Sequence, residues 1–149
     1  MARKQLPDDF RDFIHFLNEN KVKYLLVGGW AVGLYSNPRA TGDIDFLIAI
    51  DDDNLDKLKG ALAEFGAPPI EIDDFKAAGN FFRMGRPPIQ IDIITEADGI
   101  EIDECYSRRE TINIDGIPIS LISKQDLIKN KKESGRLRDL ADAEALEEI

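Results

Sequence analysis

The stretch Thr41-Gly42-Asp43-Ile44-Asp45-Phe46 carries two aspartates one residue apart, at the start of an apolar run. The pattern predicts a strand, and alternate residues of a strand point to the same face of a sheet. Asp43 and Asp45 are therefore expected to project together, while Ile44 and Phe46 face the core. Two carboxylates aimed at one point repel each other unless a cation or a shared proton lies between them. A divalent cation, which prefers oxygen ligands, is the natural occupant of such a site.

A glycine pair, Gly28-Gly29, lies upstream of these aspartates, between a second predicted strand and a short predicted helix. The apolar run 22–27 predicts the strand, and residues 30–35 predict the helix. Glycines at such a junction let the backbone approach a phosphate closely, and the free N–H groups at the start of a helix attract anions. Taken alone, the pair is more typical of a plain tight turn. Together with the aspartates, it indicates a phosphate-binding junction beside an acidic site.

A third carboxylate, Asp92, lies in the clearest alternating strand of the chain, Ile89-Gln90-Ile91-Asp92-Ile93. The isoleucines share one face of this strand, so Asp92 is expected on the other. An acid within such a strand is costly without a partner, because the neighbouring core is apolar. Three carboxylates can hold two Mg²⁺ ions, one activating an attacking oxygen and one gripping a triphosphate and its leaving group.

The composition narrows the class of protein. The chain has 149 residues and a net charge of −10, which argues against nonspecific binding to nucleic acid or anionic membranes. No apolar stretch approaches the length of a membrane span, and the start of the chain lacks the apolar segment of a signal peptide, so we expect no membrane partner and a cytoplasmic location. The single cysteine and single histidine exclude an internal disulfide and metal sites rich in either residue.

The remaining pattern alternates helices with strands and predicts an α/β (α+β) fold, a mixed twisted sheet flanked by helices. We expect a single domain over residues 1–149, with C-terminal helices in 123–149 packing on the core. Asp115-Gly116 predicts the turn of a hairpin, and Ser123 predicts the N-cap of the next helix. The predicted helices are 8–19, 30–35, 54–65, 103–108, 124–134 and 137–146. The predicted strands are 22–27, 43–50, 81–84, 89–93, 111–114 and 117–121.

Two runs carry a family resemblance: Leu26-Val27-Gly28-Gly29-Trp30-Ala31-Val32 and Arg39-Ala40-Thr41-Gly42-Asp43-Ile44-Asp45. In this order they resemble the DNA polymerase beta-like nucleotidyltransferase superfamily, and most closely its branch of small antibiotic- and toxin-type nucleotidyltransferases. Two further runs, Asp126-Leu127-Ile128-Lys129-Asn130-Lys131 and Gly135-Arg136-Leu137-Arg138-Asp139-Leu140-Ala141-Asp142, are similar to the C-terminal helices of that branch. Four patches in the right order make a far more specific signal than a lone Asp-x-Asp.

The resemblance implies a nucleotidyltransferase-like fold and an enzyme that moves a nucleoside monophosphate from an NTP such as ATP to a hydroxyl acceptor, with release of pyrophosphate. It implies that Asp43, Asp45 and Asp92 are the catalytic residues and the ligands of two Mg²⁺ ions, and that Asp92 is also the general base. The implied nucleotide-binding residues are Gly28, Gly29, Arg39, Thr41 and Lys131. The acceptor stays open among a small molecule, an RNA end and a protein. Because the chain is short for a separate acceptor domain, a homodimer or a protein partner is expected to complete the site.

Simpler interpretations of the C-terminal residues also stay open. Lys131 lies in a basic run that is typical of a solvated helix face. Asp139 and Asp142 are spaced to pair with Arg136 and Arg138 along one helix.

A second hypothesis is a binding module, a nucleotidyltransferase-like antitoxin or regulator of a toxin–antitoxin pair that acts through a partner protein. Minimal antitoxins of this type have Gly-Ser followed by Arg, whereas this chain has Gly29 and Trp30. The complete acidic trio favours the enzyme over the binding module. RNA binding through the basic helix of residues 129–138 is a third and weaker hypothesis, because no aromatic residues interleave the basic ones.

Overall fold

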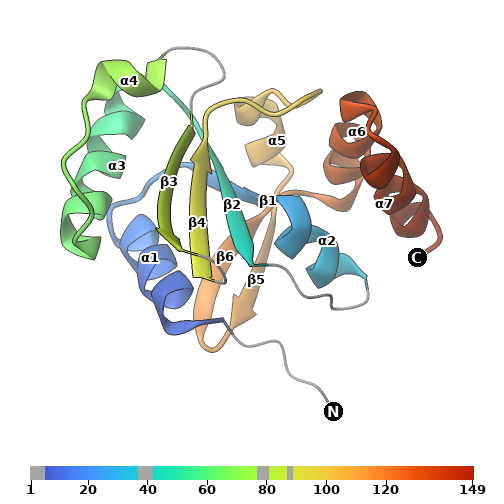
Figure 1. Ribbon diagram of the computed structural model, residues 1–149, viewed down its shortest axis with the longest axis horizontal. Helices are drawn as coiled ribbons and strands as arrows, with labels where there is room; N and C mark the ends of the chain where they lie inside the picture. The colour runs from blue at the N-terminus through green and yellow to red at the C-terminus, as the bar shows by residue number, and fades with distance from the viewer. Residues whose placement is uncertain (1–5, 37–41, 77–80, 87–88) are drawn as a thin grey trace.

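The computed structural model describes residues 6–36, 42–76, 81–86 and 89–149, which form one mixed sheet with helices on both faces (Figure 1). The sheet has six strands in the order β3-β4-β2-β1-β6-β5. The strands are β1 (Tyr24–Val27), β2 (Asp43–Ile48), β3 (Phe81–Arg86), β4 (Ile89–Ile94), β5 (Glu110–Ile114) and β6 (Ile117–Leu121). The helices are α1 (Asp8–Glu19), α2 (Gly28–Tyr35), α3 (Asp52–Phe65), α4 (Ile72–Lys76), α5 (Ile102–Ser107), α6 (Lys124–Ser134) and α7 (Leu137–Glu147). The predicted mixed sheet flanked by helices is confirmed.

The register of the sheet brings distant parts of the sequence into one row. β2 pairs antiparallel with β1 and parallel with β4, and β4 pairs antiparallel with the edge strand β3. In this register Asp45 lies opposite Asp92, and Asp92 lies opposite Arg83. Residues opposite each other in a sheet share a face, so the three side chains lie side by side on the same face.

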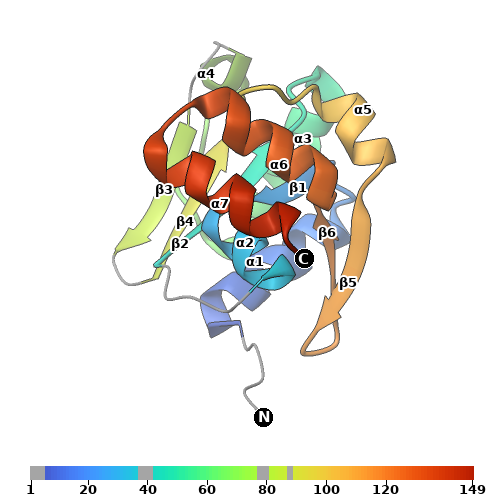
Figure 2. The ribbon, with the colours of Figure 1, turned by 90° about the vertical axis from the view of Figure 1, so that its right-hand side faces the viewer.

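Two layers of helices cover the sheet. α1 and α3 pack on the apolar face of β2, where Phe13 of α1 contacts Phe46 and Phe65 edge-to-face. On the other face α2 follows β1 directly, and α6 and α7 pack on each other and on α2. Figure 2 shows α6 and α7 lying across the front of this layer. The alternation of β2 therefore sends Ile44 and Phe46 into the core and turns Asp43 and Asp45 toward the layer of α2, α6 and α7.

Local signals define the corner between α6 and α7. The Ser123 hydroxyl caps α6 by accepting a hydrogen bond from the backbone N–H of Asp126 at 3.1 Å, as predicted. Gly135 ends α6 in the left-handed conformation, with φ of 71°. The chain reverses there, and α7 begins two residues later at Leu137.

The structure differs from the predicted elements in two places that matter. α2 begins at Gly28 itself, so the glycine pair forms the first turn of the helix instead of a loop before it. α4 lies in a segment for which the sequence predicts neither helix nor strand, because five residues with only Phe75 buried are too few to show a helical period. Within the described residues, no helix is both long and apolar enough to cross a membrane.

Candidate functional site

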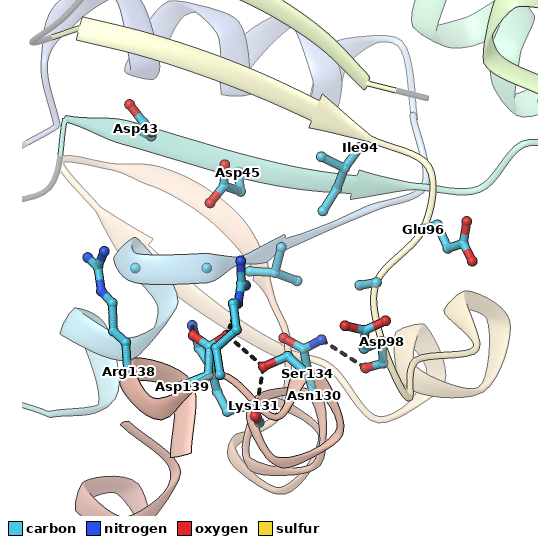
Figure 3. A pocket seen from close by; sticks show the side chains of 15 residues that line it. Asp43, Asp45, Ile94, Glu96, Asp98, Asn130, Lys131, Ser134, Arg138 and Asp139 are labelled. Carbon is cyan, nitrogen blue, oxygen red and sulfur yellow. Dashed lines mark hydrogen bonds and ion pairs between the residues drawn. The ribbon is translucent and has the colours of Figure 1, made fainter. Parts of the chain in front are cut away.

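A pocket of about 790 Å³ opens between the sheet and the α6–α7 corner (Figure 3). Its walls come from the junction of β1 and α2, from β2, from the end of β4 with the segment after it, and from α6 and α7. The lining residues are Val27, Gly28, Gly29, Asp43, Asp45, Ile94, Glu96, Ala97, Asp98, Asn130, Lys131, Ser134, Arg136, Arg138 and Asp139. Of the residues predicted to act, five line this one pocket: Gly28, Gly29, Asp43, Asp45 and Lys131.

The glycine pair forms the floor of the pocket at the N-terminus of α2. Gly28 has a φ of 71°, and a Cβ atom there would collide with the carboxylate of Asp45. Only glycine fits this position without strain, because other residues rarely adopt that φ. No side chain caps the first turn of α2. The first turn of α2 therefore lines the pocket and has no side-chain cap, and the N-terminus of such a helix suits a phosphate oxygen.

Crowding of carboxylates on β2 and β4 changes the acidity of Asp45. Its pKa is raised from 3.8 to about 7, first by burial, then by the charges of Asp92 and Asp43 and by hydrogen bonding with Asp92. The charge of Lys131 across the pocket acts in the opposite direction. The part of this shift that comes from Asp92 and Asp43 is the repulsion expected of the acidic strand, and a proton or a bound cation would relieve it.

Asp92 lies next to Asp45, although it does not line the pocket itself. It is 6% exposed, and both of its oxygens are held by Arg83: Nε donates to Oδ1 at 2.9 Å, and Nη2 donates to Oδ2 at 3.2 Å. In the structure the partner of this buried acid is thus an arginine from the edge strand, whereas the sequence predicted Mg²⁺ as its partner. Arg83 was not singled out in the sequence, because nothing short of the register of β3 against β4 connects it to Asp92.

Lys131 lies inside the α6–α7 corner, not on a solvated helix face. It is 8% exposed, and its Nζ lies 3.1 Å from Asp139 Oδ1 and 3.6 Å from Asp142 Oδ2. The Asp139 carboxylate also accepts hydrogen bonds from Ser134 Oγ at 2.6 Å and from Arg136 Nε at 2.8 Å. The pairing of Arg136 with Asp139 that the helical spacing indicated is present, but Asp142 pairs with Lys131.

The Asp139 carboxylate of α7 accepts the hydrogen bonds that connect it to α6 and to Arg136 at this corner. Burial acts to raise its pKa, but the hydrogen bonds from Ser134, Lys131 and Arg136 outweigh burial and lower the pKa to about 2. Asp139 is therefore ionised at neutral pH and holds the cationic wall of the pocket in position. Figure 3 shows Lys131, Ser134, Arg138 and Asp139 across the pocket from β2.

The residues of the acidic row suit a hard divalent cation by their chemistry. Asp43, Asp45 and Asp92 offer carboxylate oxygens, the donors that Mg²⁺ prefers. The pKa of Asp45 is raised first by burial and then by the negative charges of Asp92 and Asp43, and a bound cation would oppose both effects. In the described part of the chain, however, no three acidic, histidine or cysteine side chains already converge as a ligand set. Both oxygens of Asp92 instead accept hydrogen bonds from Arg83 of β3. Arg39 and Thr41, predicted to bind nucleotide, lie outside the described residues.

Several pocket residues were not predicted to take part. Arg136 and Arg138 lie in the C-terminal run that carried the family resemblance, and that position is the signal that would have found them. Ser134 also belongs to the α6–α7 corner, but it lies just before that run and no motif marks it. Glu96 and Asp98 follow β4, and no sequence motif marks them.

Comparison with known proteins identifies the family and the shared fold. A family model described as "Nucleotidyltransferase of unknown function (DUF6036)" matches residues 5–147. No curated protein matches the chain by sequence.

Among solved structures, a candidate nucleotidyltransferase from Thermotoga maritima has a TM-score of 0.63 at 16% identity, covering 99% of this chain and 95% of its own. The lincosamide antibiotic adenylyltransferase LnuA, solved with lincomycin bound, has a TM-score of 0.55 at 16% identity, covering 99% of both chains. The antibiotic-resistance factor ANT(2'')-Ia has a TM-score of 0.57 at 16% identity, covering 93% of this chain and 80% of its own. At this identity the neighbours establish the shared fold.

Proposed function

The chain belongs to the family of nucleotidyltransferases of unknown function (DUF6036), and from this premise we propose that it transfers a nucleoside monophosphate from an NTP to a hydroxyl acceptor. The observation that carries the proposal is the row in which Asp45 and Asp92 lie opposite each other on β2 and β4, beside the turn at Gly28. An acidic row next to open backbone N–H groups suits a reaction centre that handles a phosphate and its counter-cation together.

The triphosphate would lie between the first turn of α2 and the α6–α7 corner. Backbone N–H groups of Gly28 and Gly29 would donate to phosphate oxygens, and Lys131 would face them from the opposite wall of the pocket. Lys131 is held by two carboxylates, so its ammonium is already in position before a nucleotide binds. A preorganised cation of this kind stabilises charge without reorganisation during the reaction.

Asp43, Asp45 and Asp92 are the residues that would hold Mg²⁺. When bound, the metal would supply charge neutralisation at the triphosphate and the leaving group. The acceptor oxygen would form a bond to the α-phosphorus, the bond from that phosphorus to the β-phosphate oxygen would break, and pyrophosphate would leave. As the family resemblance implies, Asp92 would accept the proton of the acceptor hydroxyl as the general base.

The first experiment measures transfer directly. Purified protein with Mg²⁺ is incubated with each α-³²P-labelled NTP and, in turn, with small-molecule, RNA and protein fractions of a cell extract. We expect label from one NTP to appear on one size class of acceptor with release of pyrophosphate, and Asp45→Asn to reduce the rate at least a hundredfold, in the range found for loss of one charge-stabilising group. Asp56→Asn, which removes an exposed carboxylate from α3, is the matched control and should react like the wild type.

Transfer by Asp45→Asn at the wild-type rate would overturn the proposal. If no fraction is labelled while a partner protein co-purifies stoichiometrically, the binding module becomes the better description.

A further inference from the structure

The third carboxylate of the proposed site is already paired with a cation that the protein itself provides. Arg83 makes two hydrogen bonds to Asp92, of 2.9 and 3.2 Å, one to each oxygen. Bidentate contacts of this kind are among the strongest that arginine makes with a carboxylate. The register of β3 against β4 sets the two residues directly opposite each other, so the contact is built into the sheet.

The two partners differ in their freedom to move. Asp92 belongs to the interior strand β4 and its side chain is 9% exposed, whereas the side chain of Arg83 is 51% exposed and belongs to the edge strand β3. Arg83 can therefore swing toward solvent while Asp92 stays in place. The ring of Phe81, whose centre is 5.5 Å from the guanidinium carbon, gives the arginine a second contact on the same edge.

A divalent cation and Arg83 need the same oxygens. A cation shared by Asp45 and Asp92 would require at least one Asp92 oxygen, and both now accept hydrogen bonds from Arg83. In exchange, the guanidinium offsets the repulsion that Asp92 exerts on Asp45 when no cation is bound. Removing the arginine would leave the acidic row less stable by itself and more attractive to a cation.

We propose that Arg83 is a built-in competitor for divalent cations: it occupies Asp92 and must release an oxygen before this carboxylate joins the site. The inference rests on the proposed function, because it assumes that Asp43, Asp45 and Asp92 bind such a cation. It adds a level of control, since cation binding then carries the cost of opening the Arg83–Asp92 pair. The arginine acts through Asp92, as a positioning residue.

The test measures binding of Mn²⁺, a spectroscopic substitute for Mg²⁺, to the full chain without nucleotide, by electron paramagnetic resonance of the free ion. Arg83→Gln should bind Mn²⁺ about tenfold more tightly than the wild type, the factor for loss of one charged hydrogen-bonded contact. Arg83→Lys keeps the charge without the paired geometry and should fall between the two. Arg86→Gln removes the same charge from the same strand on the opposite face, and should change affinity less than twofold.

A double variant shows whether the gain passes through Asp92. Adding Asp92→Asn to Arg83→Gln should cancel the tighter binding. The inference is overturned if Arg83→Gln binds Mn²⁺ no more tightly than Arg86→Gln, or if its gain persists after Asp92 is replaced. Melting of each variant in EDTA checks the fold, and if Arg83→Gln does not fold, Arg83→Lys decides: an affinity equal to the wild type would overturn the inference.

The same titration separates failure of this inference from failure of the proposed function. Asp45→Asn should weaken Mn²⁺ binding in both the wild-type and Arg83→Gln backgrounds. If Asp45→Asn has no effect in either background, the proposed cation site itself is refuted, and the competition by Arg83 with it. If Asp45→Asn weakens binding but Arg83→Gln does not strengthen it, only the role of Arg83 is refuted.

Discussion

Asp45 combines a position fixed by the fold, a raised pKa and a proposed role in catalysis. Its carboxylate fills the space that a side chain at Gly28 would need, it lies opposite Asp92 on the adjacent strand β4, and it lines the pocket. Its pKa of about 7, raised by burial and by its acidic neighbours, means that folding favours a proton on this group. The protein thus carries a local instability that a cation would remove, as is common for residues kept for function.

This raised pKa predicts how the stability of the metal-free protein depends on pH. The folded state binds a proton at Asp45 up to about pH 7, whereas the unfolded state releases it near 3.8, so stability should fall as pH rises from about 4 to about 7. The whole loss has an upper bound of about 4 kcal/mol, because each tenfold change in proton affinity corresponds to about 1.4 kcal/mol. Asp45→Asn should flatten this slope, as measured by urea unfolding in EDTA between pH 4.5 and 8.

Two comparisons sharpen that measurement. Asp56→Asn, an exposed position on α3, should keep the wild-type slope. Asp139 acts with the opposite sign, because its lowered pKa makes stability fall as pH drops below about 4, outside the measured window. Parallel profiles for Asp45→Asn and the wild type between pH 4.5 and 8 would contradict the assignment.

At the scale of elements, what could be predicted depended on the range of the interaction. The period of two in β2 indicated which face Asp43 and Asp45 share, and the caps at Ser123 and Gly135 marked both ends of α6, because these signals lie within a few residues. The pairing of Arg83 with Asp92 depends on the order of the strands in the sheet and on the register of β3 against β4. The sequence of a single strand encodes neither of these.

The contacts between α6 and α7 likewise could not be predicted from the sequence of either helix alone. The basic run of α6 is typical of a solvated face, since its amphipathic pattern is weak, and Lys131 becomes buried only because α7 folds back on it after Gly135. The motif resemblance singled out Lys131 for nucleotide binding, but not the carboxylates of Asp139 and Asp142 that hold it.

The buried lysine predicts a stability effect that belongs to the helix pair. Lys131→Met should lower the free energy of unfolding by about 3 kcal/mol, because it leaves two buried carboxylates without their shared cation. Ser134 and Arg136 still bind Asp139, which keeps the loss at the lower end for a broken buried pair. Lys129→Met, an exposed lysine of the same helix, should change stability by less than about 0.5 kcal/mol.

Urea unfolding at pH 7 measures both variants, and adding Asp139→Asn to Lys131→Met should recover part of the loss, because one unpaired charge is removed. Equal stabilities for Lys131→Met and Lys129→Met would mean that the corner tolerates the unpaired acids and is not held together by this lysine.

At the scale of the whole molecule, negative charge dominates, with 29 acidic against 19 basic residues and a net charge of −10. A triphosphate entering this field is repelled unless a cation accompanies it, and the basic wall of Lys131, Arg136 and Arg138 faces a pocket whose other walls carry several acids. Cation and nucleotide are therefore expected to bind as a pair, each reducing the cost of the other.

This coupling predicts the thermal behaviour of the complete chain. With Mg²⁺ and the transferable NTP, supplied as its non-hydrolysable α,β-methylene analogue at about a hundred times its Kd, the protein should gain about 2.7 kcal/mol. For a chain of this size that gain corresponds to a rise in Tm of roughly 5–10 °C. Either component alone should raise Tm by less than about 2 °C. The triphosphate alone meets carboxylates whose charge is not compensated, and the cation alone must displace Arg83 without the help of a nucleotide.

Differential scanning fluorimetry with all four analogues measures these shifts. The double variant with Asp43→Asn and Asp45→Asn should abolish the joint rise in Tm, while the unliganded protein still melts cooperatively. A joint shift no larger than the sum of the separate shifts would argue against a shared cation, and no shift with any analogue would favour a binding module that acts through a partner protein.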